Sequence, residues 1–460
     1  MQKLNKRIIG AAVAVATALP LGASAQTLTS SINTYSPYSM YGLGELATQG
    51  NTAMRSMGGV GVAMQSTVSV NLLNPAAYAN TPQKSFLFDF AVDAGHFRNA
   101  QNKYDTSSSS SVKTAYNSIN FHEIAFQLPL MKGLGFGFSL SPYSNVGYNM
   151  YHDDMSSDVA GNVGRVRYQY YGEGDVTEVK AGVGWRPFKH LSVGVAMLYY
   201  WGDIKRNYNS VITDVITGSG EYSSTTGIDT YDVSKIKAQF GVQWTAIMNS
   251  KRALTFGATY DIGGALNPGM VKYVYVDNLL TSVVRNETDA SLPLRLPRQV
   301  AAGVFYQTQR IRAGLDWVYQ NWGDENADYL ESVGKGVKVA YNNTHTVKAG
   351  FEITPRPIDV RNYLNRMSYR LGFRYGDYYQ TFAGSKIAQY AVTAGLGFPI
   401  KLFGRSSIDV GFEFGMRDPK MKTVTIDNKR VGLVKQNYYK LSLGLSMFGE
   451  DRWFTRYKFE

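Results

Sequence analysis

The chain has 460 residues, with 47 Lys and Arg against 35 Asp and Glu, so its formal net charge is +12. It contains no cysteine, which excludes a disulfide framework, a cysteine-ligated metal site, a thiol nucleophile and a lipid anchor on an N-terminal cysteine. Charged residues make up only 18% of the chain, whereas aromatic residues make up 13%. Because soluble proteins usually carry about 25% charged residues, the composition favours strands that face lipid on one side and water on the other.

An export signal occupies residues 1–25. A basic start (residues 3–7) precedes an apolar stretch (8–21) and the small-residue cleavage site Ala23-Ser24-Ala25. The apolar stretch is too short for a membrane-spanning helix, which needs about 20 residues. No later segment is long and apolar enough to be one. We therefore expect an exported protein without a transmembrane helix.

The positive charge does not indicate nucleic acid as a partner, because an exported chain rarely meets any and no long run of Lys or Arg is present. We expect the excess charge to be spread over loops and lumen. Outer-membrane lipid, lipopolysaccharide and acidic partners are the contacts that this distribution favours.

Alternation with a period of two dominates the chain after residue 84. Phe86, Phe88 and Phe90 alternate with Asp89 and Asp93 around them, so one face is apolar and the other carries two carboxylates. An even number of such segments, mostly longer than the 9–11 residues that cross hydrocarbon at a tilt, predicts an antiparallel transmembrane β-barrel. The fourteen predicted strands are 84–97, 115–128, 134–148, 163–186, 191–206, 231–247, 252–262, 297–308, 311–320, 343–354, 367–380, 386–400, 406–416 and 437–448.

The connections alternate in length, as in barrels that place short turns in the periplasm and long loops outside. The predicted long loops include 98–114, 149–162, 207–230 and 263–296, and the last is long enough for a lid. In the second strand the alternation changes phase, which predicts a β-bulge near His122-Glu123.

Residues 26–83 do not alternate, and this polar, glycine-rich stretch is predicted to fill the lumen. It contains the run Met57, Gly58, Gly59 and Gly61, followed by Asn74, Pro75 and Ala76. This motif resembles the N-terminal hatch of the FadL family of outer-membrane barrels, in particular the Bacteroidetes branch. The resemblance implies a 14-stranded barrel (84–448) with a hatch inside it and a periplasmic tail (449–460).

Asn74 is interpreted as the anchor of the hatch, with its side chain bonding to backbone in the lumen. An ordinary turn before the first strand is the alternative. In the family, a kink in the third strand opens the wall sideways, and here Pro142 and Gly147 lie in that strand. Since proline removes a ladder hydrogen bond, we expect an interruption at Pro142, unless that residue already belongs to a loop.

Catalytic patterns are lacking in the sequence. The five histidines are scattered and form no metal-ligand spacing. Asp89 and Asp93 share a lumen face and could form an acid–base pair, but carboxylates are routine there. We therefore expect that the protein is not an enzyme and that it binds no metal and no cofactor.

Two functions remain open. The resemblance to the FadL family favours passive uptake of hydrophobic compounds, such as long-chain fatty acids, through the plugged lumen and the lateral opening. The alternative is a structural subunit of an outer-membrane machine for protein assembly or secretion, which docks surface lipoproteins and another barrel. The tail supports that alternative unless it folds against its own barrel, because it offers an aromatic and basic cluster of the kind enriched at interfaces. Its aromatic residues are Trp453, Phe454, Tyr457 and Phe459.

Overall fold

The computed structural model describes residues 34–104, 109–154, 159, 164–215, 224–266, 269–276, 283–289, 294–329, 338–400, 406–426 and 429–450, which belong to one structural unit. The predicted leader and residues 451–460 of the predicted tail, with their four aromatic residues, lie outside this described part. No helix within it is long and apolar enough to cross a membrane.

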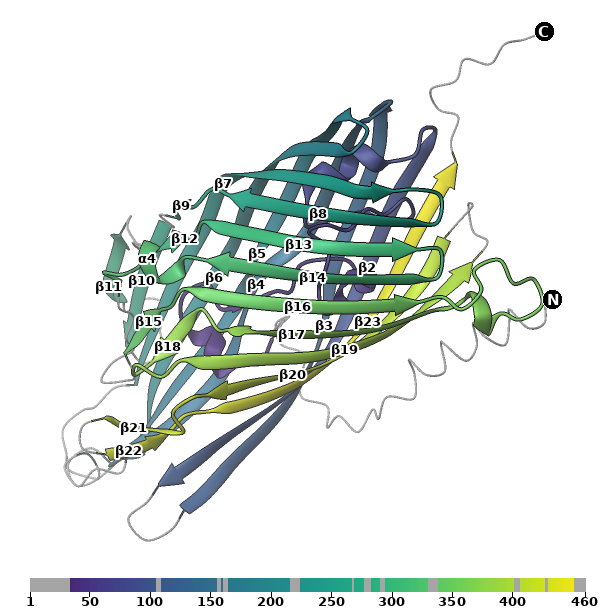
Figure 1. The fold of residues 1–460 in the computed structure, drawn as a ribbon. Coiled ribbons are helices and arrows are strands. Elements are labelled where there is room, and N and C mark those ends of the chain that lie inside the picture. The colour runs from purple at the N-terminus through teal and green to yellow at the C-terminus, as the bar shows by residue number, and fades with distance from the viewer. Residues whose placement is uncertain are drawn as a thin grey trace. The chain divides into compact units, whose positions relative to one another are not determined.

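A closed, antiparallel wall of fourteen strands forms the barrel, so the predicted fold class and strand number are confirmed (Figure 1). Each wall strand pairs with its neighbours in chain order, and the last pairs with the first from Ser85–Glu450 to Ala100–Lys435. The wall strands are β2 (Ser85–Tyr104), β3 (Ser109–Met131), β4 (Leu134–Asp154), β5 (Gly164–Phe188), β6 (Leu191–Val215), β7 (Thr225–Met248), β8 (Arg252–Asp261), β13 (Gln299–Thr308), β14 (Ile311–Gln320), β16 (Thr344–Ile353), β17 (Ser368–Asp377), β19 (Ile387–Ile400), β20 (Ser406–Pro419) and β23 (Lys435–Glu450).

Short elements decorate the two ends of the wall. We call the end with tight hairpins the turn end and the other the loop end. At the loop end β10 (Gly269–Val276) and β11 (Val283–Asp289) extend the sheet beside β7, while β21 (Thr423–Ile426) and β22 (Lys429–Gly432) form a hairpin. The small sheets β9–β12 and β15–β18 and the helix α4 make up a lid. Their bounds are β9 (Gly264–Ala265), β12 (Arg295–Leu296), β15 (Val339–Tyr341), β18 (Gln380–Phe382) and α4 (Trp322–Glu325).

Several wall strands are longer than predicted. The loops predicted at 98–114, 149–162 and 207–230 were wrong at their ends, because β2 to β7 continue as paired strands there. Beyond the membrane both faces of a strand meet water, so the alternation that marks a strand in the sequence fades. The predicted bulge is confirmed: the β2–β3 register shifts between Ala91–Glu123 and Val92–Phe121, which leaves His122 as the extra residue.

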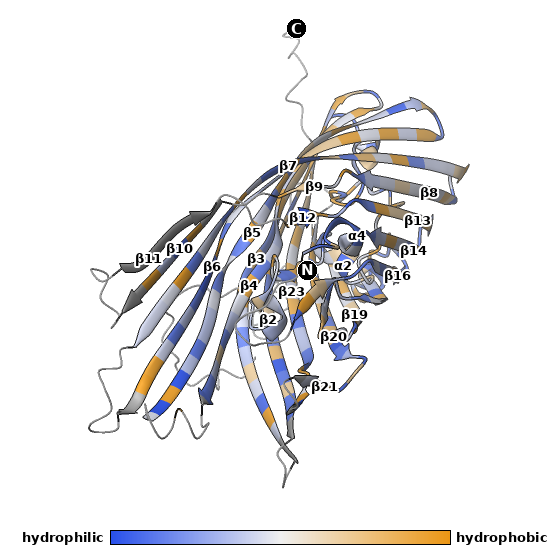
Figure 2. Ribbon diagram, turned by 90° about the vertical axis from the view of Figure 1, so that its left-hand side faces the viewer, coloured by the Kyte–Doolittle hydropathy of each residue, from blue (hydrophilic) through white to orange (hydrophobic). Residues whose placement is uncertain are grey.

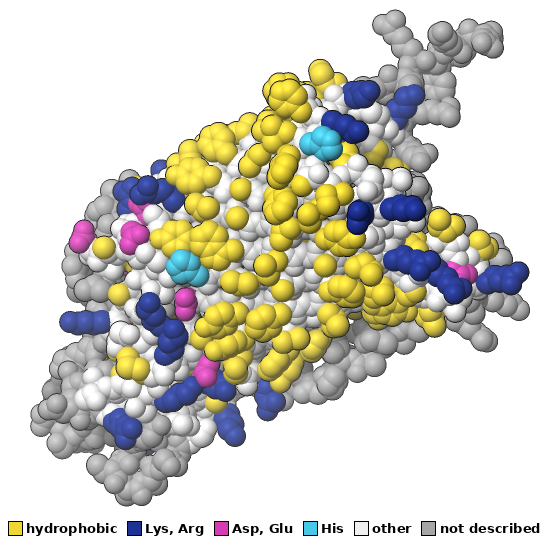
Figure 3. Space-filling model, viewed as in Figure 1, with side chains coloured by type: hydrophobic (Ala, Val, Ile, Leu, Met, Phe, Trp, Pro, Cys, Tyr) yellow, Lys and Arg dark blue, Asp and Glu magenta, His cyan; other side chains and the backbone are white. Residues whose placement is uncertain are grey.

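The outer face of the wall is apolar. Along the strands, apolar and polar residues alternate (Figure 2), and the apolar side chains form a broad belt with Lys and Arg on either side of it (Figure 3). Ile119, Trp185 and Leu371 are among the exposed apolar residues of this belt. Such a belt bounded by charges is the surface that a hydrocarbon layer requires.

The N-terminal segment from Thr34 to Asn80, which we call the plug, packs inside the barrel (Figure 1). It contains η1 (Pro37–Met40), β1 (Glu45–Leu46), α2 (Thr52–Arg55) and η2 (Pro75–Asn80). The apolar core lies between plug and wall in three clusters along the lumen. Met54 and Met57, for example, are fully buried in the middle cluster.

Wall glycines let the plug backbone come close. A Cβ on Gly372 of β17 would lie 2.0 Å from the backbone nitrogen of Gly58. Gly58 has φ +75°, a left-handed conformation that favours glycine, and a Cβ there would lie 2.6 Å from the carbonyl oxygen of Phe373. Plug and wall therefore meet backbone against backbone at this level.

Gly372→Ala tests this contact. The added methyl group has no space, so we expect overpacking that costs about 1–3 kcal/mol and displaces the plug from β17. Chemical unfolding in detergent and protease cleavage within the plug measure the effect. Gly264→Ala is the control, because its Cβ would meet only the flexible end of Lys235, at 3.3 Å; equal losses in both variants would contradict the close contact.

Candidate functional site

The loop end of the lumen is closed by aromatic residues. Tyr38 and Tyr41 of the plug pack against Phe382 of β18, with ring centroids 5.3 and 5.7 Å apart. Tyr38 also donates a hydrogen bond to the carbonyl oxygen of Val434. Trp322 of the lid is completely buried beside Tyr379, at 4.8 Å between centroids. Plug, lid and wall therefore share one apolar core at this mouth.

Below that core, an ion pair joins the plug to β20 and β23. Glu45 of β1 lies 2.7 Å from Arg417 of β20 and 3.5 Å from Lys440 of β23, and it accepts a hydrogen bond from the Thr34 hydroxyl at 2.8 Å. The Glu45 side chain is buried between these two cations. The ion pair therefore holds the plug to β20 and β23.

A second charged contact holds the plug to β2 and β3. Arg55 of α2 lies 2.8 Å from Asp93, and His122 lies 3.3 Å from the same carboxylate. The bulge turns His122 inward, where its ring nitrogen lies 3.1 Å from the carbonyl oxygen of Gly50. Four residues earlier on the same face of β2, Asp89 accepts hydrogen bonds from Asn51 and from the backbone N–H of Val70.

Asp89 and Asp93 do lie on one inward face, as predicted, but each is engaged by a different part of the plug. Their partners make them anchors of the plug in this structure. Among the described residues, no group of three or more His, Asp or Glu side chains is arranged to hold a metal ion.

The two halves of the hatch motif lie side by side. The backbone N–H groups of Gly61 and Val62 donate to one carboxylate oxygen of Asp316 on β14, at 2.7 and 2.9 Å. The Asn74 side-chain amide donates to the carbonyl oxygen of Val62 at 2.8 Å, and its oxygen accepts from the N–H of Ala76 at 3.0 Å. Asn74 therefore caps η2 and ties it to the glycine run.

Met57 is fully buried, Gly58 lies against β17, and Gly59 lies beside Lys348, while Pro75 and Ala76 begin η2 against β5 and β6. Sequence reasoning missed Asp316, Glu45, Arg55 and Arg417. For Asp316 and Arg417, which lie on wall strands, the only local signal is a charged residue at an inward position of an alternating strand. No local pattern marks Glu45 and Arg55 in the plug.

The wall has a gap between β3 and β4. These strands pair from Met131–Leu134 to Ile124–Leu140 and no further, whereas β4 stays paired with β5 as far as Asp154. The β4–β5 register shifts between Pro142 and Ser144. Pro142 and Gly147 both lie on the part of β4 that has separated from β3.

The plug covers this gap from inside. Glu45 and Leu46 pair with Asn145 and Ser144 of β4. The N–H of Ser36 donates to the carbonyl oxygen of Gly147 at 2.9 Å, and the Gln49 amide donates to that of Pro142 at 3.0 Å. On the opposite edge, the Tyr35 ring stacks on Tyr116 of β3 at 4.4 Å.

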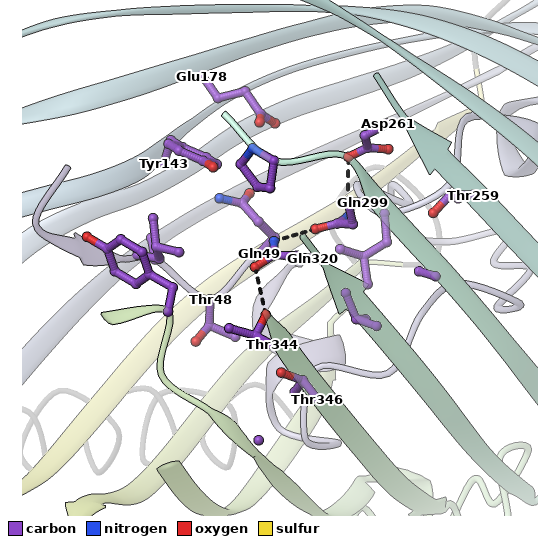
Figure 4. Close-up of a pocket in the computed structure, with 18 of the residues that line it drawn as sticks. Thr48, Gln49, Tyr143, Glu178, Thr259, Asp261, Gln299, Gln320, Thr344 and Thr346 are labelled. Atoms are coloured by element: carbon purple, nitrogen blue, oxygen red, sulfur yellow. Dashed lines mark hydrogen bonds between the residues drawn. The ribbon is translucent and has the colours of Figure 1, made fainter. Parts of the chain in front are cut away.

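A cavity of about 200 Å³ remains beside the plug. Polar and charged side chains of several strands point into it (Figure 4). One wall is a hydrogen-bonded row in which Thr344 donates to Gln320, Gln320 to Gln299, and Gln299 to Asp261. Glu178, Lys180, Lys237 and Lys348 also line the cavity. Apolar side chains, among them Leu46, Leu73, Tyr143 and Leu198, line it as well, so the cavity offers both polar and apolar surface.

The chain is similar to a known family in sequence and to solved structures in fold. A family model described as BamG matches residues 5–460. No curated protein matches the chain. Among solved structures, a Pseudomonas aeruginosa FadL homologue is similar with a TM-score of 0.58 and 13% identity, covering 88% of this chain and 99% of that chain.

Two further structures have the same fold. The Pseudomonas putida toluene transporter TodX gives a TM-score of 0.52 at 12% identity, covering 88% of this chain and 99% of its own. The Ralstonia pickettii toluene transporter TbuX gives 0.51 at 12% identity, covering 87% and 98%. At these identities the likeness is one of fold alone.

Glu45→Gln tests the ion pair of the plug. Arg417 would remain buried without its carboxylate, which costs about 3–5 kcal/mol, so we expect the plug to loosen and ion conductance in planar bilayers to rise. Adding Arg417→Met removes the stranded charge and should recover most of the lost stability. Unchanged conductance and unfolding in Glu45→Gln would contradict the anchoring role.

Asn74→Ala tests the link within the hatch motif. Loss of the cap and of the bond to Val62 should cost about 1–2 kcal/mol and increase leakage of small solutes and sensitivity to antibiotics. Asn80→Ala is a matched control, because the Asn80 side-chain nitrogen has no hydrogen-bond partner among the described residues. The role of Asn74 is refuted by equal behaviour of the two variants.

Proposed function

The chain belongs to the BamG family, and from this premise we propose that it is a barrel subunit of the Bam machinery, which assembles β-barrel proteins in the outer membrane. An export signal at residues 1–25 would direct it to that membrane, where the apolar belt contacts lipid and the loop end contacts lipopolysaccharide. Its partners in the machine would be another barrel protein and surface lipoproteins.

One observation supports this role most directly: the plug fills the lumen and also covers the gap in the wall. Apolar clusters occupy the lumen at three levels. Glu45 and Arg55 tie the plug to β20 and β2, which flank β23, and Asn74 ties it to β7. A barrel filled in this way is a rigid body suited to holding partners, because moving the plug would expose buried charges.

Uptake of hydrophobic compounds is the second candidate. The separation of β3 from β4 beyond Leu140 favours it, since a gap at Pro142 and Gly147 is a possible lateral opening. The hatch motif would then control entry. Apolar side chains such as Leu46, Leu73 and Leu198 line the cavity beside its charged groups, and they would give a hydrophobic ligand apolar surface to bury. The match to the BamG family model is what favours the subunit role.

Purification of the native particle tests the proposal. The protein, tagged and expressed at its natural level, is extracted in mild detergent from its own membrane, and the mass and composition of the particle are determined. We expect a particle several times heavier than the chain's 51.0 kDa, with partner proteins in fixed ratio that include the central barrel of the assembly machinery.

A lone barrel with bound fatty acid or hydrocarbon would overturn the subunit role and favour uptake. Depletion of the protein provides a second measurement. Loss of many outer-membrane barrels after depletion supports the proposal, whereas normal barrel levels combined with slower growth on fatty acids would support transport.

A further inference from the structure

One turn at the turn end differs from its neighbours. The other described turns there, 132–133, 189–190, 249–251 and 309–310, have two or three residues. The connection between β16 and β17 has fourteen residues (354–367) and includes η3 (Leu364–Arg366). It forms the large loop at the right-hand edge of Figure 1. A loop of this size in a tight-turned barrel needs a reason other than chain connection.

Hydrogen bonds hold this turn in one shape. The N–H of Thr354 donates to the carbonyl oxygen of Arg310, and the N–H of Arg356 donates to that of Asn365, at 2.7 and 2.8 Å. The Tyr363 hydroxyl donates to the carbonyl oxygen of Pro399 at 3.0 Å. The turn is therefore preorganised, which lowers the entropy lost when a partner binds.

Apolar side chains stand out from the turn. Ile358 is 87% exposed, Val360 78% and Leu364 60%. Among the large apolar residues that the structure describes, Ile358 is the most exposed, and only Ile119 of β3 is more exposed than Val360. The exposure of aliphatic side chains to water is unfavourable, and their burial against a partner would lower the free energy.

The charge around these side chains is positive. Arg310, Arg356 and Arg361 are exposed. The one acidic residue of the turn, Asp359, is occupied within it: the N–H of Asn362, the side-chain amide of Asn365 and the N–H of Arg361 donate to it and lower its pKa. The surface offered to a partner is thus apolar with a cationic rim.

We infer that Ile358, Val360 and Leu364 insert into an apolar pocket, rimmed by carboxylates, on a folded partner subunit at the turn end. Two exposed arginines, Arg310 and Arg356, separate the aliphatic tip from the lipid belt, which ends on these strands at Ile311 and Ile353. On this inference the tip lies outside this belt, where its cationic rim complements carboxylates on a folded partner. The inference rests on the proposed function, because only a machine subunit has such a partner.

Single-cysteine footprinting of the native complex tests the inference, since the natural chain has no cysteine. Ile358→Cys, Val360→Cys and the control Lys251→Cys, in the exposed turn 249–251, are labelled with a membrane-impermeant maleimide. At the first two positions we expect labelling in the complex to be about tenfold slower than in the isolated barrel, because interface cores exclude solvent. Labelling of Lys251→Cys should be equal in both.

Charge and apolarity are tested separately. One double variant combines Ile358→Asp with Val360→Asp, and the other combines Arg356→Glu with Arg361→Glu. Each should weaken retention of the partner by about tenfold or more, while the control Lys251→Glu should retain the partner normally. The barrel of each variant is checked for its normal unfolding profile. Normal retention by both folded double variants would overturn the inference.

The lipid alternative has its own readout. A fluorophore on Ile358→Cys in the isolated barrel, placed in vesicles of phosphatidylethanolamine and phosphatidylglycerol with nitroxide-labelled headgroups, should be quenched far less than one on Leu371→Cys in the lipid belt. Equal quenching assigns the turn to the membrane and overturns the inference. If the complex forms but the cysteines at 358 and 360 are labelled as fast as in the isolated barrel, only the docking surface is refuted. If the barrel purifies without partners, the proposed function is refuted as well.

Discussion

The inward faces of the fourteen strands carry polar and charged groups that must find partners in a lumen from which the plug excludes most water. Leaving one such group buried and unpaired costs about 1–3 kcal/mol, and more for a charge. The plug supplies these partners: Glu45 for Arg417, Arg55 for Asp93, and backbone N–H groups for Asp89 and Asp316. Wall and plug are thus complementary surfaces at these positions, and these groups would lose their partners if the two were separated.

This dependence extends to the wall itself. Where β4 separates from β3, backbone groups at its edge lose their ladder partners at a depth where lipid supplies none. The plug restores several of them through β1, Ser36 and Gln49. The same segment therefore fills the lumen and completes the wall.

The two ends of the barrel have different physical characters. At the loop end, long hairpins and a lid enclose an aromatic core that includes Trp322 and Tyr38 of the plug. At the turn end the connections are tight, except for the one that displays Ile358 and Val360 among arginines. The two ends therefore present chemically distinct surfaces.

The sequence by itself determined the fold class. Alternation with period two, the number of strands, the asymmetry of the connections and the bulge at His122 are local properties, because each follows from side chains a few residues apart. The hatch motif was also found locally, and so was the cap that Asn74 offers to the following turn. The long hairpins were underestimated, since strands with two wet faces lose the alternation that reveals them.

Only the tertiary structure decided which groups meet. Glu45 and Arg417 are 372 positions apart in the chain, and Gly61 and Asp316 are 255 apart. No local pattern marks such pairs, because they arise from the closure of the wall around the plug. The cover over the gap and the rigid, apolar turn at 354–367 depend on the same long-range packing. The physical reason is that burial and hydrogen-bond satisfaction are properties of the closed barrel, whereas strand periodicity is a property of each segment.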